Sequence, residues 1–105
     1  MIVYEVRIEV EAGIADAYHQ WLVPHVHGII AIPGFTGAEL FREDGDGTHP
    51  VFTVRYHLDS RDALETYLRE RAPRLRAEGE ARFGTRFRAS RRVMELVRQF
   101  GGGRR

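Results

Sequence analysis

Arg55 and His57 stand two positions apart in residues 50–58, a segment in which apolar and polar residues alternate. Residues two apart on an extended strand point to the same side, so we expect the guanidinium and the imidazole to lie together. A histidine titrates near neutral pH and can act as a general base when a carboxylate such as Glu5 or Glu39 orients its ring. The pattern therefore makes His57 the candidate catalytic base. A histidine at the rim of an interface is the other interpretation.

Anion-binding and aromatic residues would complete this candidate site. We expect Arg7 and Arg55 to hold an anionic group of a ligand, with Glu39 as a further ligand-binding residue. Tyr18 and Trp21 are three positions apart in a predicted helix, so they share a face and would form an aromatic wall. A second interpretation stays open for Trp21, which could instead anchor the core or an interface.

The sequence predicts no metal site and no cofactor. Cysteine is absent, which removes thiolate ligands, thiol catalysis and disulfides together. His19, His25 and His27 lie within one predicted helix, but spacings of six and two positions do not align side chains on one helix face. We expect His25 to be a partly buried histidine bonded to the backbone that Pro24 frees.

Hydrophobic periodicity divides the chain into alternating strands and helices. A proline inside a helix removes a hydrogen bond, so Pro24 predicts a kink or break near Val23, and Pro73 predicts a kink or two helices end to end. Asp44–Gly47 predicts a hairpin turn. The predicted strands are residues 1–10, 35–44, 50–58 and part of 85–98, and the predicted helices are residues 14–31 and a region that begins after the cap Ser60 and ends at Gly84.

This order of elements predicts an α+β fold, a ferredoxin-like βαββαβ sandwich. Two helical regions can cover only one face of a four-stranded sheet, so the other face stays open. That open face mixes apolar and charged side chains, among them Glu5, Phe41 and Arg55. We expect it to pair with the same face of a second copy in a homodimer and to enclose a small polar cavity. The alternative is a solvent-facing sheet with weak cross-strand ion pairs such as Glu5–Arg55.

Length and composition fit one small domain. The 105 residues, 43% hydrophobic and 30% charged, suit a single globular core. We assign residues 1–98 to the domain and residues 99–105 to a flexible tail. No apolar run approaches the roughly 18 residues of a membrane span, and the first residues carry charges where a secretory signal needs an apolar block. A cytoplasmic location without a membrane partner is therefore expected.

Basic residues concentrate late in the chain. Residues 1–60 contain three Arg and nine acidic residues, whereas residues 61–105 contain thirteen Arg and six acidic residues. Such a split can indicate a nucleic-acid surface, and RNA-recognition domains share the βαββαβ order. Those domains need exposed aromatics on their strands, whereas Phe52 and Tyr56 share the register of Val54 and hence of the core. An RNA-binding module is therefore the least favoured interpretation.

Four parts of the sequence carry a family resemblance: Ile2–Val6, Trp21, Pro33–Phe41 and Leu58–Tyr67. They resemble the dimeric α+β barrel superfamily, which includes antibiotic-biosynthesis-monooxygenase-like proteins. Within it, residues 1–98 look most like an uncharacterised bacterial family known as a domain of unknown function. The resemblance implies a homodimer whose sheets form one barrel, with a ligand cavity between each sheet and its helices or inside the barrel. Haem-degrading members use an Asn, a Trp and a His, and the absence of Asn here argues against that activity.

Binding of a small aromatic or acidic molecule in a cavity of a small homodimer is the function that these observations favour. The resemblance implies one alternative, a cofactor-independent monooxygenase or isomerase of the antibiotic-biosynthesis-monooxygenase type. No glycine-rich phosphate loop or nucleophile elbow occurs, so the sequence assigns no reaction.

Overall fold

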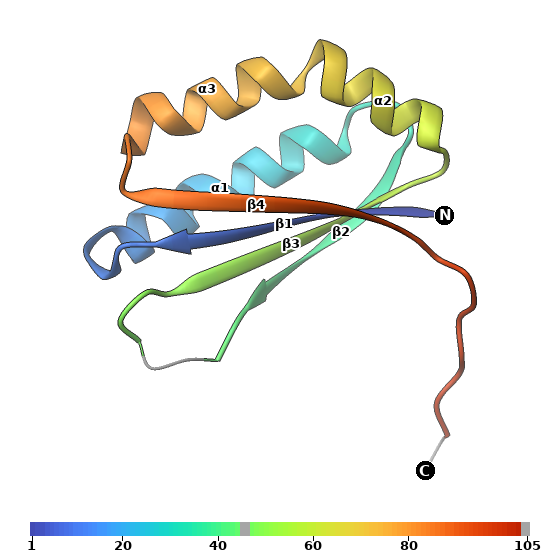
Figure 1. Ribbon diagram of the computed structural model, residues 1–105, viewed down its shortest axis with the longest axis horizontal. Coiled ribbons are helices and arrows are strands. Elements are labelled where there is room, and N and C mark those ends of the chain that lie inside the picture. Colours follow the sequence, from blue (N-terminus) through green and yellow to red (C-terminus); the bar gives the residue numbers. More distant parts are fainter. Residues whose placement is uncertain (45–46, 104–105) are drawn as a thin grey trace.

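The computed structural model describes residues 1–44 and 47–103. It has the predicted α+β architecture, with helices on one side of an antiparallel sheet (Figure 1). The elements in chain order are β1 (Ile2–Val10), a short 3₁₀ turn η1 (Ala12–Ile14), α1 (Ala15–Ile30), β2 (Phe35–Arg42), β3 (Val51–Leu58), α2 (Arg61–Glu70), α3 (Ala72–Phe83) and β4 (Phe87–Glu95).

The sheet has the strand order β2-β3-β1-β4, and every neighbouring pair is antiparallel. The two longest strands, β1 and β4, pair over their whole length, from Ile2 opposite Glu95 to Val10 opposite Phe87. Figure 1 shows α1, α2 and α3 together above one face of this sheet, while no helix covers the other face. The prediction of a helix-covered face and an open face is confirmed.

Alternation along the strands builds the core. Tyr4, Ile8 and Val10 of β1 are buried, as are Val54 and Leu58 of β3. These positions share one face because side chains alternate along a strand, and burying that apolar face against the helices stabilises the fold. The intervening residues face the uncovered side. The register predicted from residues 1–10 and 50–58 is confirmed.

Local signals set the ends of the second helical region. The Ser60 hydroxyl accepts a hydrogen bond from the Ala63 amide at 3.1 Å, as expected of an N-cap. Pro73 lies in the first turn of α3, so the chain forms two helices end to end rather than one kinked helix. Gly84 ends α3 with a φ of 62°, a conformation that glycine adopts without steric cost.

The predicted break at Pro24 is wrong, and the alternative of a kink stays a prediction. Pro24 lies inside α1, which runs without a break from Ala15 to Ile30 instead of breaking near Val23. Leu22 and Ile29, on either side of the proline, are both buried against the sheet. We attribute the continuity to this packing, which outweighs the one helical hydrogen bond that the proline removes.

The turn between α1 and β2 requires glycine. Gly34 has a φ of 96°, and a Cβ at this position would lie 2.5 Å from the Cβ of Ala63 at the start of α2. The Asp59 amide donates a hydrogen bond to the Gly34 carbonyl at 3.0 Å, which also holds this turn close to the start of α2. The Pro33-Gly34 turn therefore brings the end of α1 and the start of α2 close together.

The end of the chain is more exposed than the core strands. The edge strand β4 leaves Val93 partly exposed, and Leu96 and Val97, predicted as apolar members of the last strand, lie beyond it and are exposed. Residues 96–103 form no helix or strand, and the flexible tail stays a prediction. The predicted hairpin turn includes residues 45 and 46, which lie outside the described residues. No helix within residues 1–44 and 47–103 has the length and apolar character to cross a membrane.

Candidate functional site

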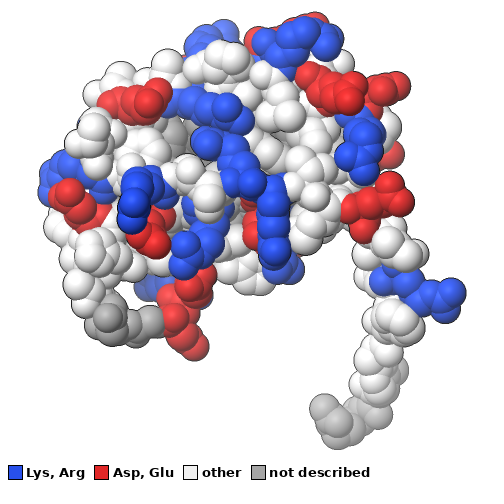
Figure 2. Space-filling model, viewed as in Figure 1, with Lys and Arg blue, Asp and Glu red and all other residues white. Residues whose placement is uncertain are grey.

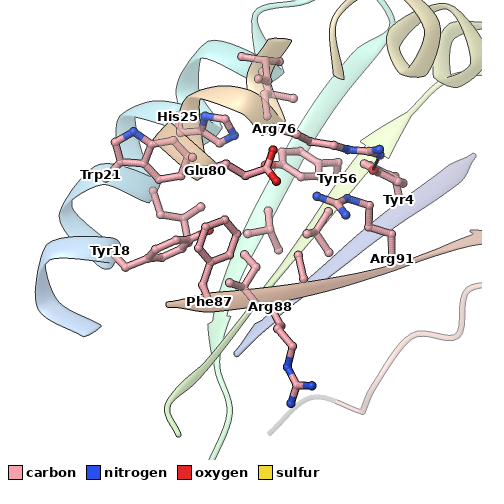
Figure 3. A pocket seen from close by; sticks show the side chains of 18 of the residues that line it. Tyr4, Tyr18, Trp21, His25, Tyr56, Arg76, Glu80, Phe87, Arg88 and Arg91 are labelled. Carbon is pink, nitrogen blue, oxygen red and sulfur yellow. Dashed lines mark hydrogen bonds between the residues drawn. The ribbon is translucent and has the colours of Figure 1, made fainter. Parts of the chain in front are cut away.

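A hollow of about 510 Å³ lies between the sheet and the helices, and we call it the helix-side cavity. Residues from β1, β3 and β4 form its floor and residues from α1 and α3 form its walls, together with Tyr67 of α2 (Figure 3). Six aromatic side chains dominate the lining: Tyr4, Tyr18, Trp21, Tyr56, Tyr67 and Phe87. An apolar, aromatic-lined hollow with a few polar groups is the usual form of a small-molecule site.

The aromatic rings of α1 and β4 form one contiguous wall. The ring centroids of Tyr18 and Trp21 are 5.5 Å apart, and those of Tyr18 and Phe87 are 5.3 Å apart. Gly79 on α3 leaves room for this wall, because a Cβ there would lie 3.2 Å from the Trp21 indole. The predicted Tyr18–Trp21 pairing is observed, and Trp21 borders a cavity.

Three tyrosine hydroxyls border the empty space. The hydroxyls of Tyr18, Tyr56 and Tyr67 have no hydrogen-bond partner among the described residues. Every fully buried side-chain nitrogen or oxygen in that part of the chain does have a partner, so these three hydroxyl oxygens are not fully buried. These hydroxyls must therefore be reachable from the cavity. Burial raises the pKa of Tyr18 and of Tyr67 to about 12, and it raises the pKa of Tyr56 as well. All three are neutral near pH 7 and can donate hydrogen bonds to a ligand.

His25 is a cavity residue that sequence reasoning did not assign to the site. Its ring stacks on Trp21 with centroids 4.4 Å apart. It makes no hydrogen bond to the backbone near Pro24 within the described part of the chain, so that expectation is wrong. Burial lowers the pKa of His25, so the imidazole is neutral near pH 7 and can accept a proton.

Charged residues stand at the border of the helix-side cavity. Arg76 of α3 donates to the Tyr4 hydroxyl at 3.1 Å. Arg91 of β4 also lines the cavity, as does the acid Glu80. Arg88 lines it too, but its guanidinium pairs with Glu9 at 3.4 Å and points away from the cavity in Figure 3.

A second hollow, of about 520 Å³, lies on the uncovered face of the sheet, and we call it the open-face pocket. Its charges are paired across strands: Glu5 accepts from Arg55 at 2.8 Å and from Arg92 at 2.6 Å. The Glu5–Arg55 pair anticipated from the sequence is confirmed. These arginines, Arg92 foremost, hold the pKa of Glu5 below its ordinary value.

Arg7 is paired in the same way on the open face. Its guanidinium donates to both carboxylate oxygens of Glu43, at 3.0 and 3.1 Å. Figure 2 shows basic side chains lying over β4, the strand nearest the viewer, with acidic side chains among them. Acidic and basic side chains that alternate in this way form ion pairs within the chain.

His57 also lies on the open face. Its Nε2 is 2.7 and 2.8 Å from the two carboxylate oxygens of Glu39, and its Nδ1 is 3.2 Å from the Met1 sulfur. The sequence anticipated a carboxylate beside His57, and Glu39 occupies that place. Its role as a catalytic base stays a prediction.

The structure does not bring the predicted site residues together. Arg7, Arg55 and the His57–Glu39 pair lie on the open face, whereas Tyr18 and Trp21 line the helix-side cavity. The sheet itself separates the two groups, so the expectation that they form one site is wrong. Sequence reasoning missed further cavity residues: Tyr4, His25, Tyr56, Tyr67, Arg76 and Arg91. One of them could have been found from the sequence. Arg91 is two positions after Ala89 and four after Phe87, so alternation places it on the same face of the last strand.

A family model described as a domain of unknown function, DUF4286, matches residues 1–97. This chain belongs to that family. No curated protein matches the chain. The structural neighbours include several antibiotic-biosynthesis-monooxygenase-like α+β proteins, which confirms the resemblance and the fold inferred from the sequence.

Three of these neighbours are described by name. The haem degrader MhuD from Mycobacterium tuberculosis, with two haems bound in its active site, is 25% identical, with 96% of this chain and 100% of that chain covered and a TM-score of 0.69. A putative antibiotic biosynthesis monooxygenase from Deinococcus radiodurans is 15% identical, with coverages of 98% and 99% and a TM-score of 0.74. The cofactor-independent oxygenase SnoaB from Streptomyces nogalater is also 15% identical, with coverages of 96% and 98% and a TM-score of 0.71. At 15% identity these two neighbours share the fold alone.

Proposed function

We propose that this protein binds a small, planar aromatic molecule in the helix-side cavity. The observation that carries the proposal is a hollow of about 510 Å³ in which aromatic rings surround three tyrosine hydroxyls that have no hydrogen-bond partner among the described residues. Flat rings stack favourably on aromatic side chains, and unpaired phenols offer hydrogen bonds that a ligand would complete. The volume lies within the range typical of small-molecule sites.

The similarity to MhuD supports the same class of ligand. That protein holds haem, a planar aromatic molecule, in its active site, and it is 25% identical to this chain over nearly its whole length. Tetrapyrroles therefore belong in any set of test ligands. Haem degradation is not proposed here, because the chain contains no Asn and its single Trp lies in α1.

Trp21 makes the proposal simple to test, because it is the only tryptophan in the chain and it lines the cavity. We would titrate the protein with naphthols, naphthoates, anthraquinones and protoporphyrin IX while recording tryptophan fluorescence and thermal unfolding. A ligand present at 100 times its Kd should stabilise the fold by about 2.7 kcal/mol. Saturable quenching with a parallel rise in Tm is expected. No saturable quenching by any compound would overturn the proposal.

A cofactor-independent monooxygenase or isomerase is the second candidate. The observation that favours it is His25, a neutral imidazole stacked on Trp21 beside the proposed ligand. Such a base could remove a phenolic proton from a bound substrate, which is the step that general-base catalysis requires. Oxygen uptake or isomerisation that is lost in His25→Gln while ligand binding persists would support it. If phenols bind but none is turned over, the enzyme proposal is refuted and the proposal of ligand binding is kept.

We further propose that two copies of the chain pair through the open faces of their sheets. No helix in the described part of the chain covers that face, and Phe41, on the uncovered side, is 44% exposed. Exposed aromatic residues are enriched at protein interfaces. Light scattering at several concentrations should give twice the chain mass of 12.1 kDa, and Phe41→Glu should return the mass to that of one chain. A single-chain mass for the unsubstituted protein at every concentration would refute the homodimer.

A further inference from the structure

Arg91 occupies an unusual place in the sheet. The β1–β4 register sets it opposite Val6, and it shares the helix-side face of β4 with Phe87 and Ala89. Those neighbours are partly buried and pack against the core, whereas Arg91 carries a charge. Figure 3 shows its guanidinium beside the cavity, on the side where Tyr4 and Tyr56 lie.

A second guanidinium reaches the same region from the helices. Arg76 of α3 bonds to the Tyr4 hydroxyl at 3.1 Å, and Figure 3 shows its head group on the same side of the cavity as that of Arg91. Both arginines act electrostatically on the hydroxyl of Tyr67, where each opposes the effect of burial on its pKa. Two positive groups, Arg91 from the floor and Arg76 from a wall, therefore lie at the same end of the helix-side cavity.

Neither guanidinium has a carboxylate partner within residues 1–44 and 47–103. This sets them apart from Arg88, which lines the same cavity and pairs with Glu9. Glu80 is the one acid in the described lining, and it stands four positions after Arg76 on the same helix. Residues four apart on a helix are neighbours, so Glu80 can compete with a ligand for Arg76.

An inward-pointing charge on an edge strand can have another purpose. Such charges discourage edge-to-edge pairing between sheets, and β4 is an edge strand. That explanation accounts for Arg91 alone. It does not account for Arg76, which comes from a helix and reaches the same end of the cavity.

We propose that Arg91 and Arg76 form a carboxylate-binding end of the helix-side cavity, so that the ligand is a planar aromatic acid. Its rings lie against Trp21 and Tyr18, and its carboxylate lies between the two guanidiniums. This inference rests on the proposed function, because it takes the cavity to be a ligand site. Arginine binds carboxylates through two parallel hydrogen bonds, which gives orientation as well as affinity.

The test compares two ligands with one ring system. We would measure the Kd of 2-naphthoate and of 2-naphthalenemethanol by quenching of Trp21, because the alcohol keeps the rings and loses the charge. The unsubstituted protein should prefer the acid by about tenfold, the ratio expected from one charge-assisted contact. Arg91→Gln should raise the Kd of the acid about tenfold and change the Kd of the alcohol by no more than about twofold. Arg91→Lys keeps the charge and should keep part of the preference.

Three further variants sharpen the result. Arg76→Gln should lower the affinity for the acid more than the affinity for the alcohol. Glu80→Gln should raise the affinity for the acid, since it removes the one competing carboxylate in the described lining. Arg74→Gln is the matched control, because Arg74 lies on the same helix as Arg76 and is not one of the described residues that line the cavity, so it should change neither Kd.

The outcomes separate this inference from the proposed function. If both probes bind with equal affinity, or if Arg91→Gln weakens both equally, the carboxylate-binding end is refuted while the aromatic site stands. If neither probe quenches Trp21, the proposed function fails and this inference fails with it. Aggregation of Arg91→Gln with an unchanged preference for the acid would assign Arg91 to protection of the sheet edge and refute its role in binding.

Discussion

The two hollows of this domain lie on opposite faces of one sheet and are almost equal in size, about 510 and 520 Å³. They differ in what their polar groups do. In the open-face pocket, Glu5 and Glu43 are paired with arginines within the chain. In the helix-side cavity, the hydroxyls of Tyr18, Tyr56 and Tyr67 have no partner among the described residues. Arg91, which borders both hollows, has none there either. The two volumes do not distinguish the hollows, and the hydroxyls without partners are the reason we propose the helix-side cavity as the ligand site.

Two adjacent residues of β4 provide the test with the largest expected effect on ligand binding. Ala89 faces the helix-side cavity and Ser90 faces the open-face pocket. Ala89→Phe should fill the cavity and weaken 2-naphthoate at least about a hundredfold, since a ring in the site excludes the ligand ring. Ser90→Phe adds the same ring to the same strand and should leave that Kd within about twofold.

Both variants are measured by Trp21 fluorescence, with circular dichroism to confirm folding. Ser90→Phe should instead lower the mass found by light scattering, because it alters the proposed interface. A loss of ligand binding in Ser90→Phe with none in Ala89→Phe would reverse the assignment of the two hollows.

The next largest effect concerns stability. Glu5 is 7% exposed and holds both Arg55 and Arg92. Glu5→Ala removes the carboxylate that these two guanidiniums share, and we expect it to lower the free energy of unfolding by about 2 kcal/mol in urea titrations. Glu9→Ala is the control, because Glu9 makes only longer contacts of 3.4 Å and should cost at most about 0.5 kcal/mol. Equal losses in both variants would contradict a special role for Glu5.

The same carboxylate predicts a pH dependence. Arginine contacts lower the pKa of Glu5 below its ordinary value of 4.5, so the folded state binds its proton less readily than the unfolded state. The resulting stabilisation is present above pH 4.5 and is lost as the pH falls through the lowered pKa of the folded state. Urea unfolding followed from about pH 7 down to about pH 3 should show this loss, and Glu5→Gln should reduce its slope. An identical slope in Glu5→Gln would exclude Glu5 as the titrating group.

The smallest expected effect tests the site first inferred from the sequence. His57→Ala and Arg55→Ala change residues on the open face, so the Kd of 2-naphthoate should stay within about twofold of the unsubstituted value. His25→Ala is the comparison variant in the helix-side cavity. It removes the ring that stacks on Trp21, so it should raise the Kd of 2-naphthoate. A large loss in His57→Ala would move the ligand to the open face.

Much of the fold was readable because its signals are local. The alternation of residues 1–10 and 50–58, the Ser60 cap and the Pro73 interruption each act within a few residues, and all three predictions agree with the structure. The break at Pro24 failed because packing of the helix on the sheet is not local. Sequence patterns report propensity, and tertiary contacts decide where propensities conflict.

The site was readable only in parts. The pairing of His57 with Glu39 follows from strand alternation, as does the shared face of Tyr18 and Trp21. Which of these groups share a cavity depends on the side of the sheet each one faces. Strand alternation assigned Arg55 to the open face, yet we still expected it to form one site with Tyr18 and Trp21 of the helix. The contact between Arg76 and Tyr4 joins residues 72 positions apart, and no spacing rule predicts such a contact.

One spectrum tests the central claim that the helix-side cavity, and not the open-face pocket, is the ligand site. We would record two-dimensional ¹H–¹⁵N spectra of the protein during titration with 2-naphthoate. We expect saturable shifts of the single indole N–H, that of Trp21, and of the Gly79 and Ala89 amides, with little change at Thr53. Shifts confined to Thr53 and Arg55, with an unmoved indole signal, would contradict it.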